Sequence, residues 1–331
     1  MINSLNLKDR KKFDFNNHIL ESVLVLLMIV IAVLTPGFMT SNNLLNMLKN
    51  VSLQGVIALG LTMTIIGGQI DLSVGSGVAL YGVIVAKIAG DLSNAGIMPL
   101  EKAVFIGMAA AFISSFIVGI IIAWLHIHFR MPTFIITLAF LNILYGAAAL
   151  LSRGFPITTL PRWYNEIGAG RIGGLIPVPA IVLLVVFLIV FIIMNYMRVG
   201  REIYAVGGNE ESARLCGINV KKIKTIYLVA PQLMACVSAI LVSSQVMSAS
   251  SQFGKGYEMT AIPSVIIGGA ALSGGVGTVW GTFIGIIFLG VISNGMTILN
   301  VNEFVQYVVR GSLILVAVAV NTIMENKRQG I

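Results

Sequence analysis

Long apolar runs separated by short polar segments constrain this chain more than any other feature. Of its 331 residues, 57% are hydrophobic and only 10% are charged, whereas soluble domains carry about 25% charged residues. A helix needs roughly 20 apolar residues to cross a bilayer, and about ten runs approach that length. They predict an all-α polytopic membrane protein forming a single domain over residues 1–331, with spans at 20–38, 51–68, 72–90, 103–125, 132–152, 177–197, 225–247, 259–274, 278–298 and 305–323.

The segment at residues 198–224 is the longest charged stretch and sets the expected topology. Its basic residues are Arg198, Arg201, Arg214, Lys221, Lys222 and Lys224. Short basic loops beside membrane spans stay on the cytoplasmic side. An even number of spans then places both tails, 1–19 and 324–331, on that side as well. The net charge of +8 therefore reflects topology, so membrane lipid is an expected partner and nucleic acid is not.

A short helix is predicted inside this cytoplasmic loop. Its signals, in chain order, are the side-chain-free approach of Gly207 and Gly208, the N-cap Asn209, the first-turn acids Glu210 and Glu211, Arg214 near the carbonyl end and the stop at Gly217. Two turns of helix are not stable alone in water, so this helix must dock against something. A solvated basic linker is the alternative interpretation.

A second short helix is expected in the loop at residues 39–50. Ser41 and Asn42 can cap it, and Leu44, Leu45 and Leu48 follow at helical spacing. This pattern favours a separate amphipathic helix that lies at the outer membrane interface.

The sequence also contains an internal repeat. Residues 65–77 begin Ile-Ile-Gly-Gly and continue Leu-Ser-x-Gly-x-Gly, and residues 266–277 follow the same order with one residue fewer. Both copies join an incoming span to an outgoing one, which predicts a parallel repeat with glycine-broken spans near the transport pathway. The glycines at the breaks are Gly67, Gly68, Gly75, Gly268, Gly269 and Gly275.

Motifs for catalysis and cofactor binding are missing from the sequence. Gly254-Lys255-Gly256 lacks the spacing of a Walker A loop, so ATP is not expected to bind by that route. The histidines and cysteines do not have metal-ligand spacing. We therefore expect no enzyme activity, no cofactor and no metal site in this chain.

Asp71 is the one acid among the glycine-broken runs, with Gln69 and Ser73 beside it. A carboxylate inside a membrane protein is a candidate for function by default. Asp71 either caps a helix that begins at Leu72, which we favour, or contacts a solute in the pathway. Asn142 and Asn294 are further candidates for the pathway, although an amide within a span can also bridge neighbouring helices.

Three stretches of the chain, in this order, resemble one family. Gly68-Gln-Ile-Asp-Leu-Ser-Val-Gly-Ser76, the segment from Tyr204 to Ile218 and Gly268-Gly-Ala-Ala-Leu-Ser-Gly-Gly-Val-Gly-Thr-Val-Trp-Gly281 are similar to segments of the permeases of ribose-type ABC importers. The sequence departs from the family pattern at Gln69, Ser212 and Cys216. The resemblance covers nearly the whole chain.

The resemblance implies a set of partners and a role for each segment. Two such permeases, identical or paralogous, would form the pore for a monosaccharide in the bacterial cytoplasmic (inner) membrane. A periplasmic or tethered sugar-binding protein would deliver the sugar, and a cytoplasmic ABC ATPase would bind a coupling helix at residues 207–218, which includes Ala213 and Ile218.

Two alternatives remain beside a sugar permease. An ABC permease of the same architecture can carry a nucleoside, a branched-chain amino acid or a furanosyl signalling molecule. A secondary transporter driven by an ion gradient belongs to a different class. The scarcity of acids and bases inside the predicted spans argues against it.

Overall fold

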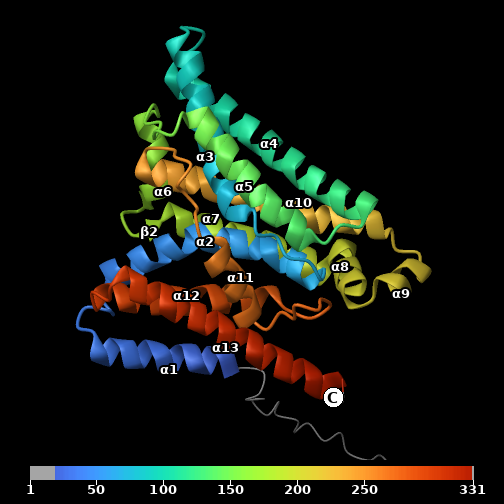
Figure 1. Ribbon diagram of the computed structural model, residues 1–331. Coiled ribbons are helices and arrows are strands. Elements are labelled where there is room, and N and C mark those ends of the chain that lie inside the picture. The colour runs from blue at the N-terminus through green and yellow to red at the C-terminus, as the bar shows by residue number, and fades with distance from the viewer. Residues whose placement is uncertain (1–18, 330–331) are drawn as a thin grey trace, which may run out of the picture.

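The computed structural model describes residues 19–329, so most of the predicted cytoplasmic tail at 1–19 lies outside the described residues. The described residues are mostly helical, with one short two-stranded sheet (Figure 1). In order, its elements are α1 (Ile19–Leu34), α2 (Ser41–Ile66), α3 (Val74–Asn94), α4 (Leu100–Phe129), α5 (Thr133–Ser152), η2 (Arg162–Tyr164), α6 (Asn165–Ala169), β1 (Arg171–Ile172), β2 (Ile176–Pro177), α7 (Val178–Tyr196), α8 (Arg198–Gly208), α9 (Glu210–Leu215), α10 (Val220–Val246), α11 (Glu258–Ile267), α12 (Val279–Ile298) and α13 (Glu303–Gln329).

Among the described residues, 7 helices are long and apolar enough to cross a membrane, namely α2, α3, α4, α5, α7, α10 and α12. Two shorter apolar helices lie in α1 and α11. The remaining predicted span, 305–323, falls within α13. These helices confirm the prediction of an all-α polytopic membrane protein.

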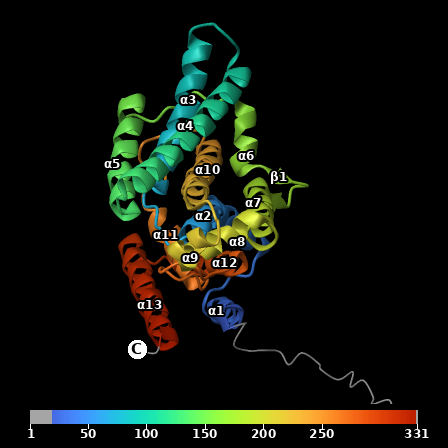
Figure 2. The ribbon, with the colours of Figure 1, turned by 90° about the vertical axis from the view of Figure 1, so that its right-hand side faces the viewer.

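The core of the protein lies around α10, which packs against α2, α3 and α4. Figures 1 and 2 show α3, α4 and α5 grouped at one end of the molecule and α1 and α13 at the other, with α2 and α12 between them. Small buried residues on α10, such as Ala235 and Ala239, allow this close approach on several sides.

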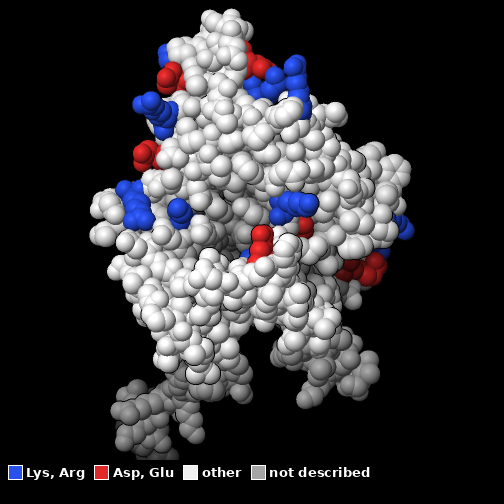
Figure 3. All heavy atoms as spheres, turned by 60° about the vertical axis from the view of Figure 1, so that its left-hand side comes forward, with Lys and Arg blue, Asp and Glu red and all other residues white. Residues whose placement is uncertain are grey.

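The outer surface is largely apolar. Figure 3 shows one face on which charged side chains are few and broad areas carry none. On α4, Phe105, Phe116 and Trp124 are exposed, and Leu150 on α5 is 82% exposed. Such large exposed apolar areas are unfavourable in water and are suited to a lipid environment.

The structure corrects two of the expected elements near α2 and α11. The segment 39–50 forms no separate interfacial helix, because its residues from Ser41 onward are the first turns of the continuous helix α2. The run 259–274 is not one helix either. α11 ends at Ile267, and the left-handed backbone at Gly269 and Gly274 turns the following segment away from the helix axis.

The basic segment 198–224 also contains more helix than the predicted loop with one short helix. It contains all of α8 and α9, and α10 begins inside it at Val220. The apolar spacing of Gly200, Ile203 and Val206, all buried, is the signal for α8. Most of the segment is therefore helical.

Candidate functional site

The predicted short helix of the basic segment is α9, and its ends have the expected hydrogen bonds. The side chain of Asn209 accepts a hydrogen bond from the backbone N–H of Ser212 at 2.8 Å, which makes Asn209 the N-cap. Gly217 has φ +82°, and the N–H of Ile218 donates to the carbonyl oxygen of Ala213 at 3.1 Å. This pattern is a glycine C-cap, so the sequence signals for both ends of the helix are confirmed.

One side of α9 is held against the protein and the other faces solvent. Ala213 is buried, and Lys224 of α10 forms an ion pair with Glu210 at 2.6 Å. The Lys224 side chain is only 13% exposed. On the outer side, Glu211 pairs with Arg214 at 2.6 Å in full solvent, and the hydrogen bond with Glu211 raises the pKa of Arg214. α9 therefore presents a charged, accessible face from a fixed position.

Gly207 and Gly208 do not form the sharp approach that the sequence suggested. They are the last two residues of α8, and their backbone packs against other segments. A Cβ at Gly207 would overlap the carbonyl oxygen of Ile66 at the end of α2, and one at Gly208 would lie 3.9 Å from the Cα of Gly275. Position 207 therefore requires glycine because the backbones pack closely there, and not because the chain turns.

The end of α8 meets two other glycine turns at what we call the glycine junction, formed by Gly68, Gly207, Gly208, Gly274 and Gly275. The N–H of Gly275 donates to the carbonyl oxygen of Ile66 at 2.8 Å. A Cβ at Gly274 would lie 2.6 Å from the carbonyl oxygen of Gly207 and 2.8 Å from the Cα of Gly68. Three segments from distant parts of the chain thus touch backbone to backbone, one of them immediately before α9.

The two copies of the internal repeat end their helices in the same way. Gly67 and Gly268 have φ −71° and −66°, and the glycines after them have φ +77° and +89°. The hydrogen bonds also correspond: N–H groups of Gly67, Gly68 and Gln69 donate to the carbonyl oxygens of Met63, Ile65 and Thr64, and those of Gly268, Gly269 and Ala270 donate to Ser264, Ile266 and Val265. Both turns then pass through the region of the glycine junction.

Asp71 lies in a fully buried hydrogen-bond network. One carboxylate oxygen accepts the backbone N–H of Ser73 at 2.8 Å and its hydroxyl at 2.6 Å. The other accepts the side-chain N–H of Gln232 at 2.8 Å, and the Gln232 oxygen accepts the Tyr81 hydroxyl at 2.6 Å. The sequence predicted that the next helix begins at Leu72, but α3 begins at Val74, with Ser73 at its N-cap position. Gln232 and Tyr81 were not anticipated, because their contact with Asp71 joins distant parts of the sequence.

A second buried acid lies close to this network. A Cβ at Gly75 would overlap a side-chain oxygen of Glu258, which is only 7% exposed. Gly75 therefore makes room for an acid on α11 that the sequence did not single out.

The other amide candidates for the pathway, Gln69, Asn142 and Asn294, share no hydrogen bond with Asp71 or with one another. The Gln69 side chain accepts the hydroxyl of Thr133 on α5 at 2.6 Å. Asn142 donates only to the carbonyl oxygen of Leu138, within its own helix. Asn294 forms a reciprocal amide pair with Asn43 of α2, with both hydrogen bonds at 2.9 Å. Of these amides, Asn294 bridges two helices and Asn142 does not.

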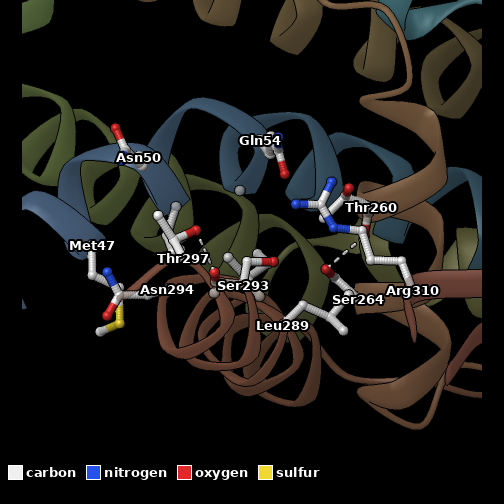
Figure 4. A pocket seen from close by; sticks show the side chains of 14 residues that line it. Met47, Asn50, Gln54, Thr260, Ser264, Leu289, Ser293, Asn294, Thr297 and Arg310 are labelled. Carbon is white, nitrogen blue, oxygen red and sulfur yellow. Dashed lines mark hydrogen bonds between the residues drawn. The ribbon is translucent and has the colours of Figure 1, made fainter. Parts of the chain in front are cut away.

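A cavity of about 240 Å³ opens beside Asn294, between α2, α11, α12 and α13 (Figure 4). Its lining is polar for a membrane protein. The side chains that matter for its chemistry are Asn50, Gln54, Ser264, Ser293, Asn294 and Arg310. Arg310 brings a positive charge into the lining, and the residues around the cavity include no acid.

Comparison with known proteins gives a consistent result. The family described as "Branched-chain amino acid transport system / permease component" matches residues 43–318. The ribose import permease protein of Escherichia coli (strain K12) is 37% identical over 313 residues, 92% of each chain. That of Bacillus subtilis (strain 168) is 38% identical over 298 residues, 89% of each chain.

A permease for another pentose is also similar. The L-arabinose transport system permease protein of Escherichia coli (strain K12) is 32% identical over 297 residues, covering 89% of this chain and 87% of that protein. No solved structure matches the chain.

Proposed function

The chain belongs to the family described as the permease component of the branched-chain amino acid transport system, and on that premise we propose that it forms the translocation pathway for a monosaccharide in a bacterial ABC importer. It is a multi-pass membrane subunit and a transport protein rather than an enzyme. ATP hydrolysis is assigned to a separate cytoplasmic subunit.

The monosaccharide cargo is supported by the relatives. The chain is 37% and 32% identical to a ribose and an arabinose permease protein over most of its length. The family description names branched-chain amino acids, so an amino acid stays the second candidate, beside a nucleoside or a furanosyl signal. The relatives favour the sugar, because their likeness extends over 92% and 89% of this chain.

We assign the docking of the ATPase to α9 and the residues around it, 207–218. The helix is capped at both ends, is held by the Glu210–Lys224 ion pair and exposes the charged pair Glu211–Arg214. A two-turn helix with these properties is suited to transmit a movement, because it cannot unfold without losing its anchors. On this assignment the docking face lies on the cytoplasmic side, and we propose the same side for both tails.

The glycine junction is the observation that carries this mechanism. When α9 moves with the ATPase, α8 moves with it, and the backbone at Gly207 touches the ends of α2 and of the second repeat copy. Close-packed backbones have no flexible side chains to absorb a displacement. The helices that end at the two glycine turns, α2 and α11, therefore follow α9 and open the pathway on the outer side.

The importer on this proposal also contains a second permease and a binding protein. A second permease, identical or paralogous, would complete the pore, and a periplasmic or tethered sugar-binding protein would deliver the cargo. The exposed apolar helix faces leave room for both a lipid boundary and a second subunit.

A crosslinking experiment tests the docking assignment. Glu210→Cys is introduced with Cys216 and Cys236 replaced by serine, and the complete transporter is treated with a short bifunctional thiol reagent. We expect a crosslink to the ATPase from residue 210 and none from the control Asn142→Cys, which lies on α5. An equal yield from both positions, or no crosslink from residue 210, refutes the assignment.

An uptake experiment tests the function itself. D-ribose and L-arabinose are supplied to proteoliposomes that hold the permease, its ATPase and the binding protein. Uptake should require ATP, be inhibited by orthovanadate and be unaffected by a protonophore. Uptake that survives without the ATPase and collapses with the protonophore would identify an ion-coupled transporter instead.

A further inference from the structure

Taking the proposed transport function as given, we propose that the cavity beside Arg310 is a solute site for a small hydroxylated molecule that carries one anionic oxygen group, a carboxylate or a phosphate. Arg310 binds the anionic group, and the neutral polar side chains of the lining bind the hydroxyls.

The neutral lining has unused hydrogen-bonding capacity. Among the described residues, the side chains of Asn50 and Gln54 have no hydrogen-bond partner. The hydroxyl of Ser264 donates to a carbonyl oxygen of its own helix at 2.8 Å, and that of Thr297 does the same at 2.8 Å, so the oxygen atoms of both remain free to accept. Both donors and acceptors are thus available, as a molecule with several hydroxyl groups requires.

Arg310 supplies a charge that nothing described nearby neutralises. Its Nε is buried and has no hydrogen-bond partner among the described residues. The ion pairs of the described residues do not include it, and its contact with the Tyr307 ring, at 6.0 Å from the centroid, is a distant one. A guanidinium group in such a place is costly unless an anion pairs with it. Its fork of N–H donors matches a carboxylate or a phosphate.

Arg310 lies at one end of the cavity, and the paired amide of Asn294 lies at the other. Figure 4 shows the Arg310 guanidinium pointing toward Gln54 and Thr260, while Asn294 lies at the other end beside Met47. Asn294 is held in place by its reciprocal pair with Asn43. A bound molecule is therefore oriented, with its anionic group toward α13.

The size of the cavity limits the ligand to a small solute. Its volume of about 240 Å³ is below the roughly 300–1,000 Å³ of pockets for drug-sized ligands. A sugar acid or a phosphorylated sugar of five or six carbons is the class that combines this size with hydroxyls and one anionic group.

Charge-selective thiol modification tests the site without knowledge of the ligand. Ser293→Cys, with Cys216 and Cys236 replaced by serine, is placed in the complete transporter in phosphatidylcholine liposomes. An anionic and a cationic methanethiosulfonate reagent of similar size are then compared. We expect the anionic reagent to react at least about threefold faster relative to a free thiol, and Arg310→Gln to remove this preference. The control Asn142→Cys should show no dependence on Arg310.

Protection by ligands tests the class of solute. D-ribonate should slow modification of Ser293→Cys more than D-ribose does at the same concentration, and Arg310→Gln should abolish the difference. Equal protection by both sugars, protection by neither, or a thiol that no reagent reaches overturns the proposal.

A lipid headgroup is the other possible source of an anionic oxygen group. The modification is therefore repeated in liposomes that contain phosphatidylglycerol. If that lipid protects Ser293→Cys as D-ribonate was expected to, the cavity is a lipid site and the proposal is wrong. If Ser293→Cys shows no charge preference while Arg310 is intact, and the transporter still shows ATP-driven uptake, the solute site is overturned and the proposed function is not.

Discussion

The carbonyl oxygen of Ile66 accepts a hydrogen bond from the backbone N–H of Gly275 at 2.8 Å, although the two residues lie in opposite halves of the chain. This bond ties the end of α2 to the turn after α11, and Gly207 at the end of α8 packs against the same carbonyl oxygen. The place where the two repeat copies meet is therefore also the place where the segment before α9 contacts them.

Gly207→Ala should weaken the glycine junction, whereas Gly208→Ala should not. The new methyl group at residue 207 would overlap the carbonyl oxygen of Ile66, while one at residue 208 has its nearest neighbour at 3.9 Å. Overpacking of this kind costs about 1–3 kcal/mol. We expect a lower thermal midpoint and little sugar uptake for Gly207→Ala only. Similar behaviour of the two variants would contradict the close contact.

The ion pair between Glu210 and Lys224 should contribute more to stability than the pair between Glu211 and Arg214. Lys224 is 13% exposed, but Glu211 and Arg214 are 64% and 67% exposed. Exposed pairs within one helix are worth about 0.2–0.5 kcal/mol. Double-mutant cycles with glutamine, measured by chemical unfolding, should therefore give a larger coupling energy for Glu210 and Lys224. An equal or smaller coupling would mean that α9 is not held by this contact.

Gln232→Leu should destabilise the protein through the buried network of Asp71. The change leaves one oxygen of Asp71 and the Tyr81 hydroxyl without their partner, and a buried polar group without a partner costs about 1–3 kcal/mol. Asn142→Leu is the matched control, because its amide bonds only to its own helix. The control should stay within about 0.5 kcal/mol of the unchanged protein. A stable, active Gln232→Leu variant would show that the network is dispensable.

Tyr204→Phe should lower the free energy of unfolding only at pH values where the Tyr204 phenol of the unchanged protein is protonated. The Tyr204 hydroxyl donates to the carbonyl oxygen of Gly277 at 2.8 Å, and burial raises the pKa of this phenol. A raised pKa in the folded state means that the stabilisation is fully present below the unfolded pKa of about 10 and is lost as pH rises through the folded pKa. The unchanged protein should be about 1 kcal/mol more stable at pH 8, and the difference should shrink above about pH 10. A constant difference at all pH values would exclude this donor role.

Local signals in the sequence were reliable where short-range chemistry decides the structure. The caps at Asn209 and Gly217 are formed as predicted, because a side chain or a positive φ acts on its immediate neighbours. The same local logic failed for Gly207 and Gly208, where the packing partner lies in another segment. It also failed for residues 39–50, since α2 continues through them once it packs against α12.

The sequence by itself determined that this is a helical membrane protein and that helices end at Gly67 and Gly268, because bilayer length, apolar runs and glycine are properties of the local chain. Only the tertiary structure decided that Gln232 satisfies Asp71, that two glycine turns meet the end of α8 and that Arg310 lines a polar cavity. These contacts join residues far apart in the sequence. Which residues come into contact depends on how whole helices pack, and a pattern in one sequence does not say which distant helices are neighbours.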